Sequence, residues 1–451
     1  MAFDRNMDEW VQDFISTEDE VEEHIELKIL YEAAKQEIEE EKQKILGMKH
    51  GGSRKNRRPN IERGHVQGHA RIWNDYIKED ATYADHFRRR FRMRKELFLR
   101  IHDKIVQHNP YFQQKPDAAR RPGISSLQKI LAAFRMLSGG VTADFMDEYV
   151  RIAESTAQQS FKEFVSSVVD VFGTEYLRQP TREDITKQLS INNDRGFPGM
   201  FGSIDCTHWV WKNCPVAWQG QYQNKDGTRS VIMEAVASQN LWFWHIFVGM
   251  SGSNNDINVM NASTWMVNYI KGKGVPVPFT INDHEYDSWY LLADGIYPNY
   301  KCFMKTIQDP IGEKYNYYRE RQEGARKDIE RAFGVLQQRW GILQNPARHW
   351  RKEDIITIWT ACVILHNMVI EDEEPYPDLN QDYLFEKDKE DEEEDARIER
   401  DSEQKVEEPL CIERYKKEFQ EIADKNAHMA LKKDLIEHLW SWKGNRRMRD
   451  T

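Results

Sequence analysis

The chain has 451 residues, which is long enough for two or three domains of roughly 100 to 200 residues with a sizeable core. Its five cysteines form no CxxC pair and are odd in number, which argues against a disulfide framework and a zinc ribbon and favours a reducing compartment. No apolar run approaches the ~20 residues of a membrane span, and the start lacks the pattern of a signal peptide, so we expect an intracellular protein without a membrane segment.

Charge is distributed very unevenly along the chain, whose formal net charge is −11. Residues 50–135 contain 20 Lys and Arg against 8 Asp and Glu, whereas residues 371–409 contain 5 against 19. The acidic ends therefore mask a basic middle. The negative net charge does not exclude a DNA-binding protein.

The N-terminal part is expected to be an acidic helical appendage over residues 1–49, followed by a basic, flexible linker over residues 50–69. The helical pattern is loose and lies among many glutamates of residues 8–42. The linker contains Gly, Pro and clustered Arg and Lys, so a nuclear-import signal, a phosphate-contacting arm and a plain solvated linker all remain open.

Residues 70–190 are predicted to be a helical, helix-turn-helix-like region that binds DNA or a partner. Ser125 and Ser126 are candidate caps of the clearest helix, which Gly139 and Gly140 should end. A second helix is expected after Thr142 and a third over residues 156–172. In a helix-turn-helix the third helix would present polar side chains to DNA, namely Gln158, Gln159 and Lys162. A plain helical bundle is the alternative.

From Gly199 the pattern changes to short apolar strands with helices among and after them, which predicts an α/β domain over residues 199–372. A long helix is expected over residues 322–340, with a buried stripe at Ile329, Phe333, Leu336 and Trp340. An apolar helix should follow and pack across the sheet. Residues 373–409 are expected to be an acidic disordered tract and residues 410–451 a C-terminal helical segment.

Three acidic residues stand in unusual positions. Asp205 lies inside an apolar strand, and Asp294 ends a second strand just before a glycine, where a side chain can emerge at the carboxyl edge of the sheet. Glu330 lies about 100° from the buried stripe of the long helix, near Arg326, whose flank suits a phosphate backbone. Carboxylates without His or Cys favour Mg²⁺ or Mn²⁺, and two such ions can promote phosphodiester cleavage or strand transfer.

The alternative is purely structural: Asp205 caps a turn, Asp294 begins one, and Glu330 pairs with Arg326. The long motifs favour the metal site. The segments GSIDCTHWVWKNCPVAWQGQY, GMSGSNNDINVMNAS, YLLADGIYPNY, RKDIERAFGVLQQRWGIL and CVILHNMVIEDE closely resemble the nuclease domain of PIF/Harbinger transposases of the plant Pong-like branch. The resemblance extends over roughly residues 50–375.

This resemblance implies an RNase H-like mixed sheet with flanking helices, the DDE nuclease core. It assigns catalysis to Asp205, Asp294 and Glu330, with Asp256 as a further metal ligand; the alternative for Asp256 is a helix N-cap. It also implies a Myb-like DNA-binding partner from the same element, and double-stranded DNA substrates with terminal inverted repeats and A/T-rich targets. A homo-oligomer is expected, located in the nucleus or held in the cytoplasm until the Myb-like partner carries it in.

Other candidate site residues near these motifs are expected to have structural roles. His208 is expected to pack in its strand, and His366 to be a hydrogen-bonded core residue. Trp209, Trp211 and Trp218 could stack on bases but are expected to be core side chains. The rival function is a host-adopted, transposase-derived chromatin or protein-interaction factor that does not cut DNA.

Overall fold

The computed structural model describes residues 61–116, 120–375 and 425–447. The chain divides into two compact units between Glu62 and Arg63. The acidic helix predicted within residues 1–49, the basic residues 50–60 and the acidic tract from residue 376 lie outside the described residues.

Helices fill the chain from His65 to Asp194. In order they are α3 (His65–Ile72), the π-helical turn η1 (Trp73–Ile77), the 3₁₀ turn η2 (Ala84–His86), α4 (Phe87–Phe91), α5 (Lys95–His108), α6 (Ser126–Gly139), α7 (Phe145–Val150), α8 (Glu154–Tyr176) and α9 (Arg182–Asp194). Because α3 begins at His65, the last five residues of the segment predicted as a flexible linker are helical.

Helix α6 begins and ends where its sequence signals predict. The Ser125 hydroxyl accepts a hydrogen bond from the Gln128 N–H at 3.2 Å, and the Gln128 side chain accepts one from the Ser125 N–H, which forms a capping box. Gly140 then ends the helix with a φ of 60°. Helix α8 is longer than predicted at both ends. At its C-terminal end the buried side chain of Tyr176 continues the apolar stripe.

The second half of the chain contains a mixed five-stranded sheet in the order β3-β2-β1-β6-β7. Strand β1 pairs antiparallel with β2 and parallel with β6, β2 pairs antiparallel with β3, and β6 pairs parallel with β7. The strands are β1 (Met200–Val210), β2 (Ser230–Ala237), β3 (Phe243–Ser251), β6 (Tyr290–Ala293) and β7 (Phe303–Lys305). The predicted mixed α/β character is confirmed.

Shorter elements and the long helices complete this half. The shorter ones are η3 (Val216–Trp218), α10 (Gln219–Tyr222), α11 (Asp256–Ala262), α12 (Thr264–Ile270) and the pair β4 (Phe279–Ile281) and β5 (His284–Tyr286). The long helices are α13 (Glu313–Arg339), α14 (Lys352–Glu373) and α18 (Lys425–Arg447). Helix α13 starts nine residues before the predicted position, but its buried stripe from Ile329 to Trp340 is confirmed.

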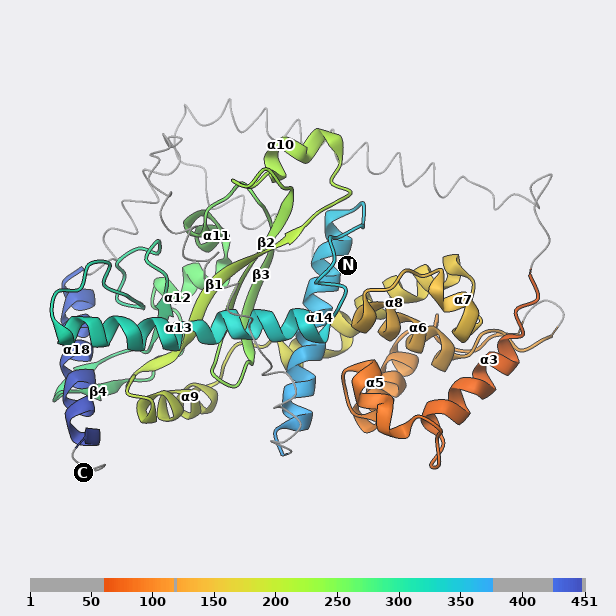
Figure 1. Ribbon diagram of the computed structural model, residues 1–451, viewed down its shortest axis with the longest axis horizontal. Helices are drawn as coiled ribbons and strands as arrows, with labels where there is room; N and C mark the ends of the chain where they lie inside the picture. Colours follow the sequence, from red (N-terminus) through yellow and green to blue (C-terminus); the bar gives the residue numbers. More distant parts are fainter. Residues whose placement is uncertain (1–60, 117–119, 376–424, 448–451) are drawn as a thin grey trace, which may run out of the picture. The chain divides into compact units, whose positions relative to one another are not determined.

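Helices cover both faces of the sheet, and α13 crosses in front of the strands in Figure 1. Successive side chains of β2 point to opposite faces of the sheet and therefore pack in two different hydrophobic cores. Ala235 and Ala237 pack with residues of α13 and α14, whereas Val236 packs with residues of α9, α11 and α12. We call these two sides the α13 face and the α11 face.

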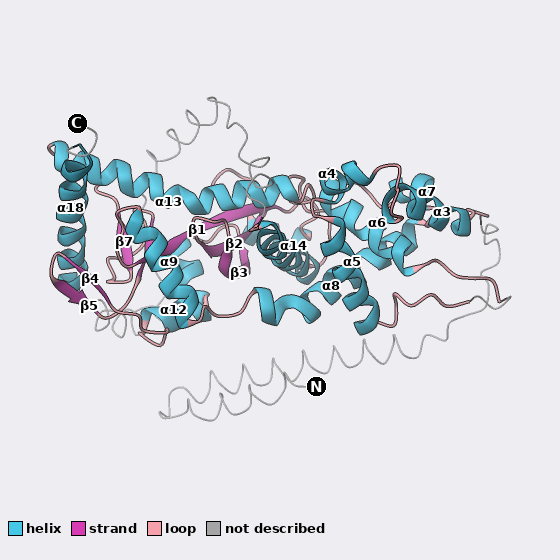
Figure 2. Ribbon diagram, turned by 90° about the horizontal axis from the view of Figure 1, so that it is seen from below, coloured by secondary structure: helices cyan, strands magenta, loops and turns pink. Residues whose placement is uncertain are grey.

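Helix α14 joins the sheet to the N-terminal helices. Figure 2 looks nearly along α14 and shows it between the strands and α8, and it contacts both β3 and α8. By length and composition it could cross a membrane, which contradicts the expectation that no apolar run is long enough. However, 72% of its apolar stretch is buried inside the protein. Its His366 is fully buried and hydrogen-bonded to the Leu241 carbonyl at 3.0 Å, as predicted for a core histidine.

The end of α14 also neutralises part of the basic segment 88–95. Arg88 pairs with Glu373 at 2.7 Å, and Arg94 pairs with Asp372 at 2.7 Å. Glu373 is fully buried, so breaking its pair would leave a charge without compensation. Less of this basic segment is therefore available to DNA than its residue count suggests.

Helix α18 packs on the sheet domain and contributes to a core of its own. Leu435 is fully buried with Met200, Tyr290 and Leu292 of β1 and β6. The Asp434 carboxylate also accepts hydrogen bonds from His284 and from the Tyr286 hydroxyl, at 2.6 and 2.7 Å. The end of the chain thus supports the two strands that hold Asp205 and Asp294.

We expect Leu435→Ala to lower the free energy of unfolding by about 2–5 kcal/mol, because the change leaves a cavity in this core. Met429→Ala on the same helix is a matched control, since that side chain is 62% exposed, and should change stability by less than about 0.5 kcal/mol. Urea denaturation of the full chain measures both. Equal stability of the two variants would contradict a structural role for α18.

Candidate active site

Asp205 lies on β1, and Asp294 directly follows β6, the neighbouring parallel strand. Ser203 of β1 is paired with Leu292 of β6, and continuing this register by two residues sets Asp205 opposite Asp294. Parallel strands lie about 4.8 Å apart, and residues two positions apart face the same side. The register therefore brings both aspartates to the carboxyl edge of the strand pair, on the α13 face.

Two hydrogen-bonded contacts fasten α13 across this edge. The Ser203 hydroxyl donates to the Ala325 carbonyl at 3.3 Å. The buried Gln322 amide donates to the carbonyls of Ala293 and Met304, at 3.3 and 3.1 Å. These bonds fix the rotation of the helix, so the next turn presents Arg326 and Glu330 to Asp205.

Arg326 bridges the two carboxylates from the strand and the helix. Its guanidinium lies 3.2 Å from the Asp205 carboxylate and 3.0 Å from the Glu330 carboxylate. All three side chains are largely buried, with exposed fractions of 16% for Arg326, 18% for Asp205 and 27% for Glu330. The pairing of Glu330 with Arg326, the structural alternative from the sequence, is therefore present, and Arg326 holds Asp205 as well.

The charge state of Asp205 depends on this environment. Burial raises the pKa of its carboxyl to about 7, against the opposing effects of Arg326 and of the Cys206 N–H, which donates to Asp205 at 2.8 Å. Asp256 and Glu330 raise the pKa of Asp205 further through repulsion. At neutral pH this carboxyl is thus close to its titration midpoint.

Asp256 belongs to the same electrostatic cluster. It is the first residue of α11, and the N-cap is Asn255, whose side chain accepts from the Asn258 N–H at 2.9 Å, so the N-cap interpretation of Asp256 is wrong. Burial raises the pKa of Asp256, and repulsion from Asp294 and Glu234 adds to this shift. Asp256 therefore links Asp205 to Asp294 electrostatically.

Glu234 is an acidic residue near this cluster that our sequence analysis missed. It is fully buried in the middle of β2, opposite Cys206, and its carboxylate lies 3.3 Å from His245. The signal was present in the sequence, since a lone glutamate in an otherwise apolar strand, VIMEAVA, resembles the position of Asp205. Glu234 raises the pKa of Asp256 and adds negative charge behind the site.

The donor chemistry fits a hard divalent cation. The available ligands are carboxylate oxygens, which hard divalent cations prefer; they belong to Asp205, Asp256, Asp294 and Glu330. Burial and repulsion between carboxylates raise the pKa of Asp205 and of Asp256, and a bound cation would relieve this repulsion. Within the described ranges, no group of three or more His, Cys, Asp or Glu side chains is close enough to hold a metal ion. Arg326, between Asp205 and Glu330, supplies the positive charge there instead.

The residues predicted to contact DNA lie in two different places. Gln158, Gln159 and Lys162 are on α8, where they bond to Glu154, Glu163 and Asp354 respectively. Gln158 and Lys162 border a cavity that the four acids do not line. Arg326, predicted as a phosphate contact, lies instead within the carboxylate cluster.

The tryptophans and His208 mostly have structural roles. Trp209 and Trp211 are buried, so the expectation that they are core side chains is confirmed; Trp218 is 42% exposed, and the same expectation is wrong for it. His208 forms a 2.9 Å hydrogen bond with Ser230 of the neighbouring strand, but its side chain is exposed, so the expectation that it packs in the strand is wrong.

Comparison with known proteins agrees with the motifs. Residues 174–376 match the family described as plant transposon protein. "Protein ALP1-like" of Arabidopsis thaliana is 25% identical over 257 residues, which cover 56% of this chain and 62% of that protein. "Putative nuclease HARBI1" of Rattus norvegicus is 23% identical over 256 residues, which cover 56% of this chain and 69% of that protein.

Over this range the chain is similar to the plant transposon proteins and to the two relatives named above. This confirms the resemblance seen in its motifs. Asp205, Asp256, Asp294 and Glu330 all fall inside the matched range. Residues 68–106 match a domain of unknown function, and no solved structure matches the chain.

Proposed function

We propose that this protein is a divalent-metal-dependent DNA endonuclease of the transposase type, which cuts transposon ends and joins them to target DNA. The observation that supports it most is the convergence of Asp205 and Glu330 on Arg326 where α13 is fastened over β1 and β6, with Asp294 set near Asp205 by the strand register and Asp256 coupled to both aspartates electrostatically. The similarity of residues 174–376 to the plant transposon protein family supports this assignment.

The fold also supports the proposal. A mixed five-stranded sheet covered by helices on both faces is what an RNase H-like nuclease core would require. In such a core the acids would come from two strands and from a helix that crosses them; Asp205 in β1, Asp294 directly after β6 and Glu330 in α13 are compatible with that arrangement.

In the proposed mechanism Mg²⁺ or Mn²⁺ would be held by Asp205 and Asp294 from the sheet and by Glu330 from the helix, with Asp256 as a further ligand. When bound, a pair of such ions activates a water or a 3′-hydroxyl and stabilises the departing oxygen at phosphorus. Arg326 pairs with both Asp205 and Glu330 in the protein without metal. Once these carboxylates have another counter-charge, its guanidinium can donate to a phosphate oxygen of the DNA.

The remaining parts of the proposal concern partners and location. Double-stranded DNA with terminal inverted repeats would be the substrate, A/T-rich DNA the target, and a Myb-like protein of the same element the partner that supplies sequence recognition. Helices α6 to α8 would act as a helix-turn-helix-like region, with Gln158, Gln159 and Lys162 near DNA. The protein would act as a homo-oligomer in the nucleus.

One observation favours the rival function, an adopted factor without nuclease activity. Arg326 gives Asp205 and Glu330 a shared positive partner from within the protein, and such a pairing would hold this cluster together in a factor that binds no metal. Retention of all four acids favours the enzyme.

The deciding experiment is cleavage of DNA carrying element ends by the purified full-length protein and its Myb-like partner, with MgCl₂, with MnCl₂ and with EDTA. We expect metal-dependent cutting by the wild type and a loss of at least about 1,000-fold for Asp205→Ala, Asp294→Ala and Glu330→Ala, as when a main catalytic group is removed. Glu320→Ala, an exposed acid on the same helix as Glu330, should keep full activity.

The outcome separates the two functions. Cutting that survives all three alanine substitutions would mean that another site or a contaminant is responsible. A wild type that binds DNA and its partner but never cuts, with either metal, would make the adopted factor the better description.

A further inference from the structure

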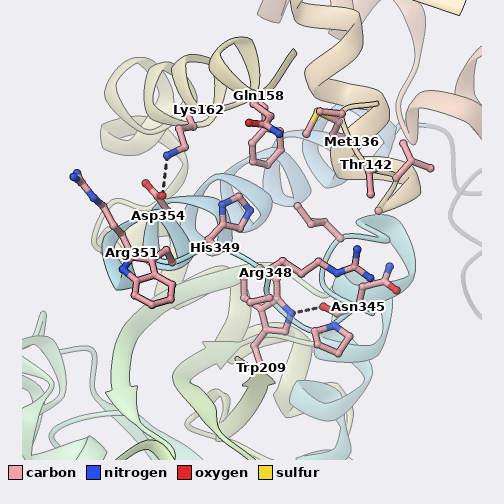
Figure 3. Close-up of a pocket in the computed structure, with 18 residues that line it drawn as sticks. Met136, Thr142, Gln158, Lys162, Trp209, Asn345, Arg348, His349, Arg351 and Asp354 are labelled. Carbon is pink, nitrogen blue, oxygen red and sulfur yellow. Dashed lines mark hydrogen bonds and ion pairs between the residues drawn. The ribbon is translucent and has the colours of Figure 1, made fainter. Parts of the chain in front are cut away.

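A cavity of about 460 Å³ lies between the N-terminal helices and the loop that joins α13 to α14. Figure 3 shows Gln158 and Lys162 of α8 on one side, and Arg348, His349 and Arg351 of the loop on the other. We call it the 341–351 pocket after that loop. Its volume is within the range of about 300–1,000 Å³ that is usual for small-ligand sites.

The loop that forms this pocket is held rigidly against the end of β1. The Ala347 N–H donates to the Val210 carbonyl at 2.7 Å, and the Lys212 N–H donates back to the Ala347 carbonyl at 2.9 Å. The Trp209 indole N–H also donates to the Asn345 carbonyl, at 2.8 Å. The pocket is thus preformed and fixed to the strand that contains Asp205.

The mouth of the pocket has unpaired positive charge and an exposed aromatic ring. In the part of the chain that the structure describes, the guanidinium groups of Arg348 and Arg351 have no hydrogen-bond or ion-pair partner. Trp350, between them, is 66% exposed, although large aromatic side chains are usually well buried. Lys162 is compensated by Asp354 at 3.1 Å, so the two arginines leave the mouth with a net positive charge.

The interior of the pocket is aromatic. The rings of Phe161 and His349 stack on each other at 5.9 Å with an interplanar angle of 17°. Phe161 and Trp209 are 1% and 4% exposed and form the wall of the pocket, so the exposed ring of Trp350 is the aromatic surface that a ligand can reach most fully. Flat aromatic surfaces bind nucleobases by stacking, and arginine forks bind phosphate oxygens. An acidic peptide could satisfy the arginines, but it would not use the aromatic surfaces, so the combination favours a nucleotide.

The pocket is also close to the carboxylate cluster. Trp209 follows Asp205 by four residues on the same strand, which is about 13 Å, and period two sets both on the same face. A DNA strand with its backbone at Asp205 would therefore pass the pocket within about four base-pair steps.

We propose that the 341–351 pocket binds one unstacked nucleotide of the DNA near the cut, with its base on the exposed ring of Trp350 and its phosphates beside Arg348 and Arg351. This proposal rests on the proposed DNA-cutting function and adds to it a requirement for locally distorted DNA. A fully paired duplex keeps its bases inside the helix and cannot fill the pocket.

The test measures binding in EDTA, so that it does not depend on cleavage. The probe is a hairpin DNA with one unpaired 2-aminopurine, compared with the same hairpin fully paired. The full-length wild type should quench the fluorescence of the unpaired probe. Trp350→Ala, which removes an exposed side chain, should abolish the quenching and weaken binding of this probe about 10-fold, with the paired hairpin unaffected.

The double variant Arg348→Ala/Arg351→Ala should weaken binding of both hairpins. It should also reduce the slope of the logarithm of the binding constant against the logarithm of the salt concentration by about two, because two phosphate contacts are lost. Lys301→Ala/Lys433→Ala is its control, because it removes the same charge from two exposed positions outside the pocket. Phe145→Ala removes an exposed aromatic ring on α7 and controls for Trp350→Ala.

Unchanged quenching in Trp350→Ala, or equal losses for both hairpins, would overturn the pocket proposal. If such a protein still cuts DNA with metal, the proposed function stands without the pocket. If the wild type binds neither hairpin, the pocket proposal falls, whereas the proposed function is still decided by cleavage of element ends with the Myb-like partner.

Discussion

Asp205→Asn is expected to abolish DNA cutting and at the same time to stabilise the metal-free protein above pH 7. Burial raises the pKa of Asp205 from 3.8 to about 7, so between these values the folded protein holds a proton that the unfolded chain has lost. The contribution of this group to the free energy of unfolding therefore falls as pH rises through that window and levels off above about pH 7.

Asparagine resembles the protonated form and does not titrate. Relative to the wild type, Asp205→Asn should gain about 2–3 kcal/mol in the free energy of unfolding between pH 5 and pH 8, since one pKa unit corresponds to about 1.36 kcal/mol. Urea denaturation in EDTA at several pH values measures this. Asp287→Asn, at an exposed position, should show no such gain. A constant difference between wild type and Asp205→Asn across this range would contradict the raised pKa.

Arg326→Met is expected to destabilise the metal-free protein by about 2 kcal/mol and to increase its stabilisation by Mg²⁺. The substitution leaves the Asp205 and Glu330 carboxylates without their shared counter-charge in a largely buried place. In the wild type a cation must displace the Arg326 guanidinium to bind the Asp205 and Glu330 carboxylates. In Arg326→Met no positive side chain competes with the cation for these carboxylates. A ligand that binds only the folded state stabilises it more as its affinity rises.

Thermal unfolding with and without MgCl₂ measures this effect. Arg319→Met is the matched control, because Arg319 forms an exposed i,i+4 pair with Glu323 on the same helix. It should change stability by less than about 0.5 kcal/mol and leave the response to Mg²⁺ unchanged. If Mg²⁺ shifts Arg326→Met and the wild type equally, Arg326 does not compete with the metal, and the site proposed for the ion is wrong.

Local patterns in the sequence were enough to locate the elements on which the candidate site depends. Ser125 and Gly140 bound α6 because a capping side chain and a left-handed glycine act over a few residues. The motifs around Asp205, Asp294 and Glu330 led to the family that the comparisons confirm. Alternating and helical periodicity also predicted the mixed α/β character, because both patterns repeat within one element.

The features that decide the chemistry involve residues far apart in the chain. Arg326 meets Asp205 across 121 positions, and Asp256 joins the cluster through burial that no local pattern shows. The same is true of Arg88 and Glu373, whose pairing lowers the charge available to DNA, and of Leu435, which completes the core beneath Tyr290. Electrostatic compensation and close packing depend on distance in space, so only the folded arrangement of strands and helices determines which of these side chains act together.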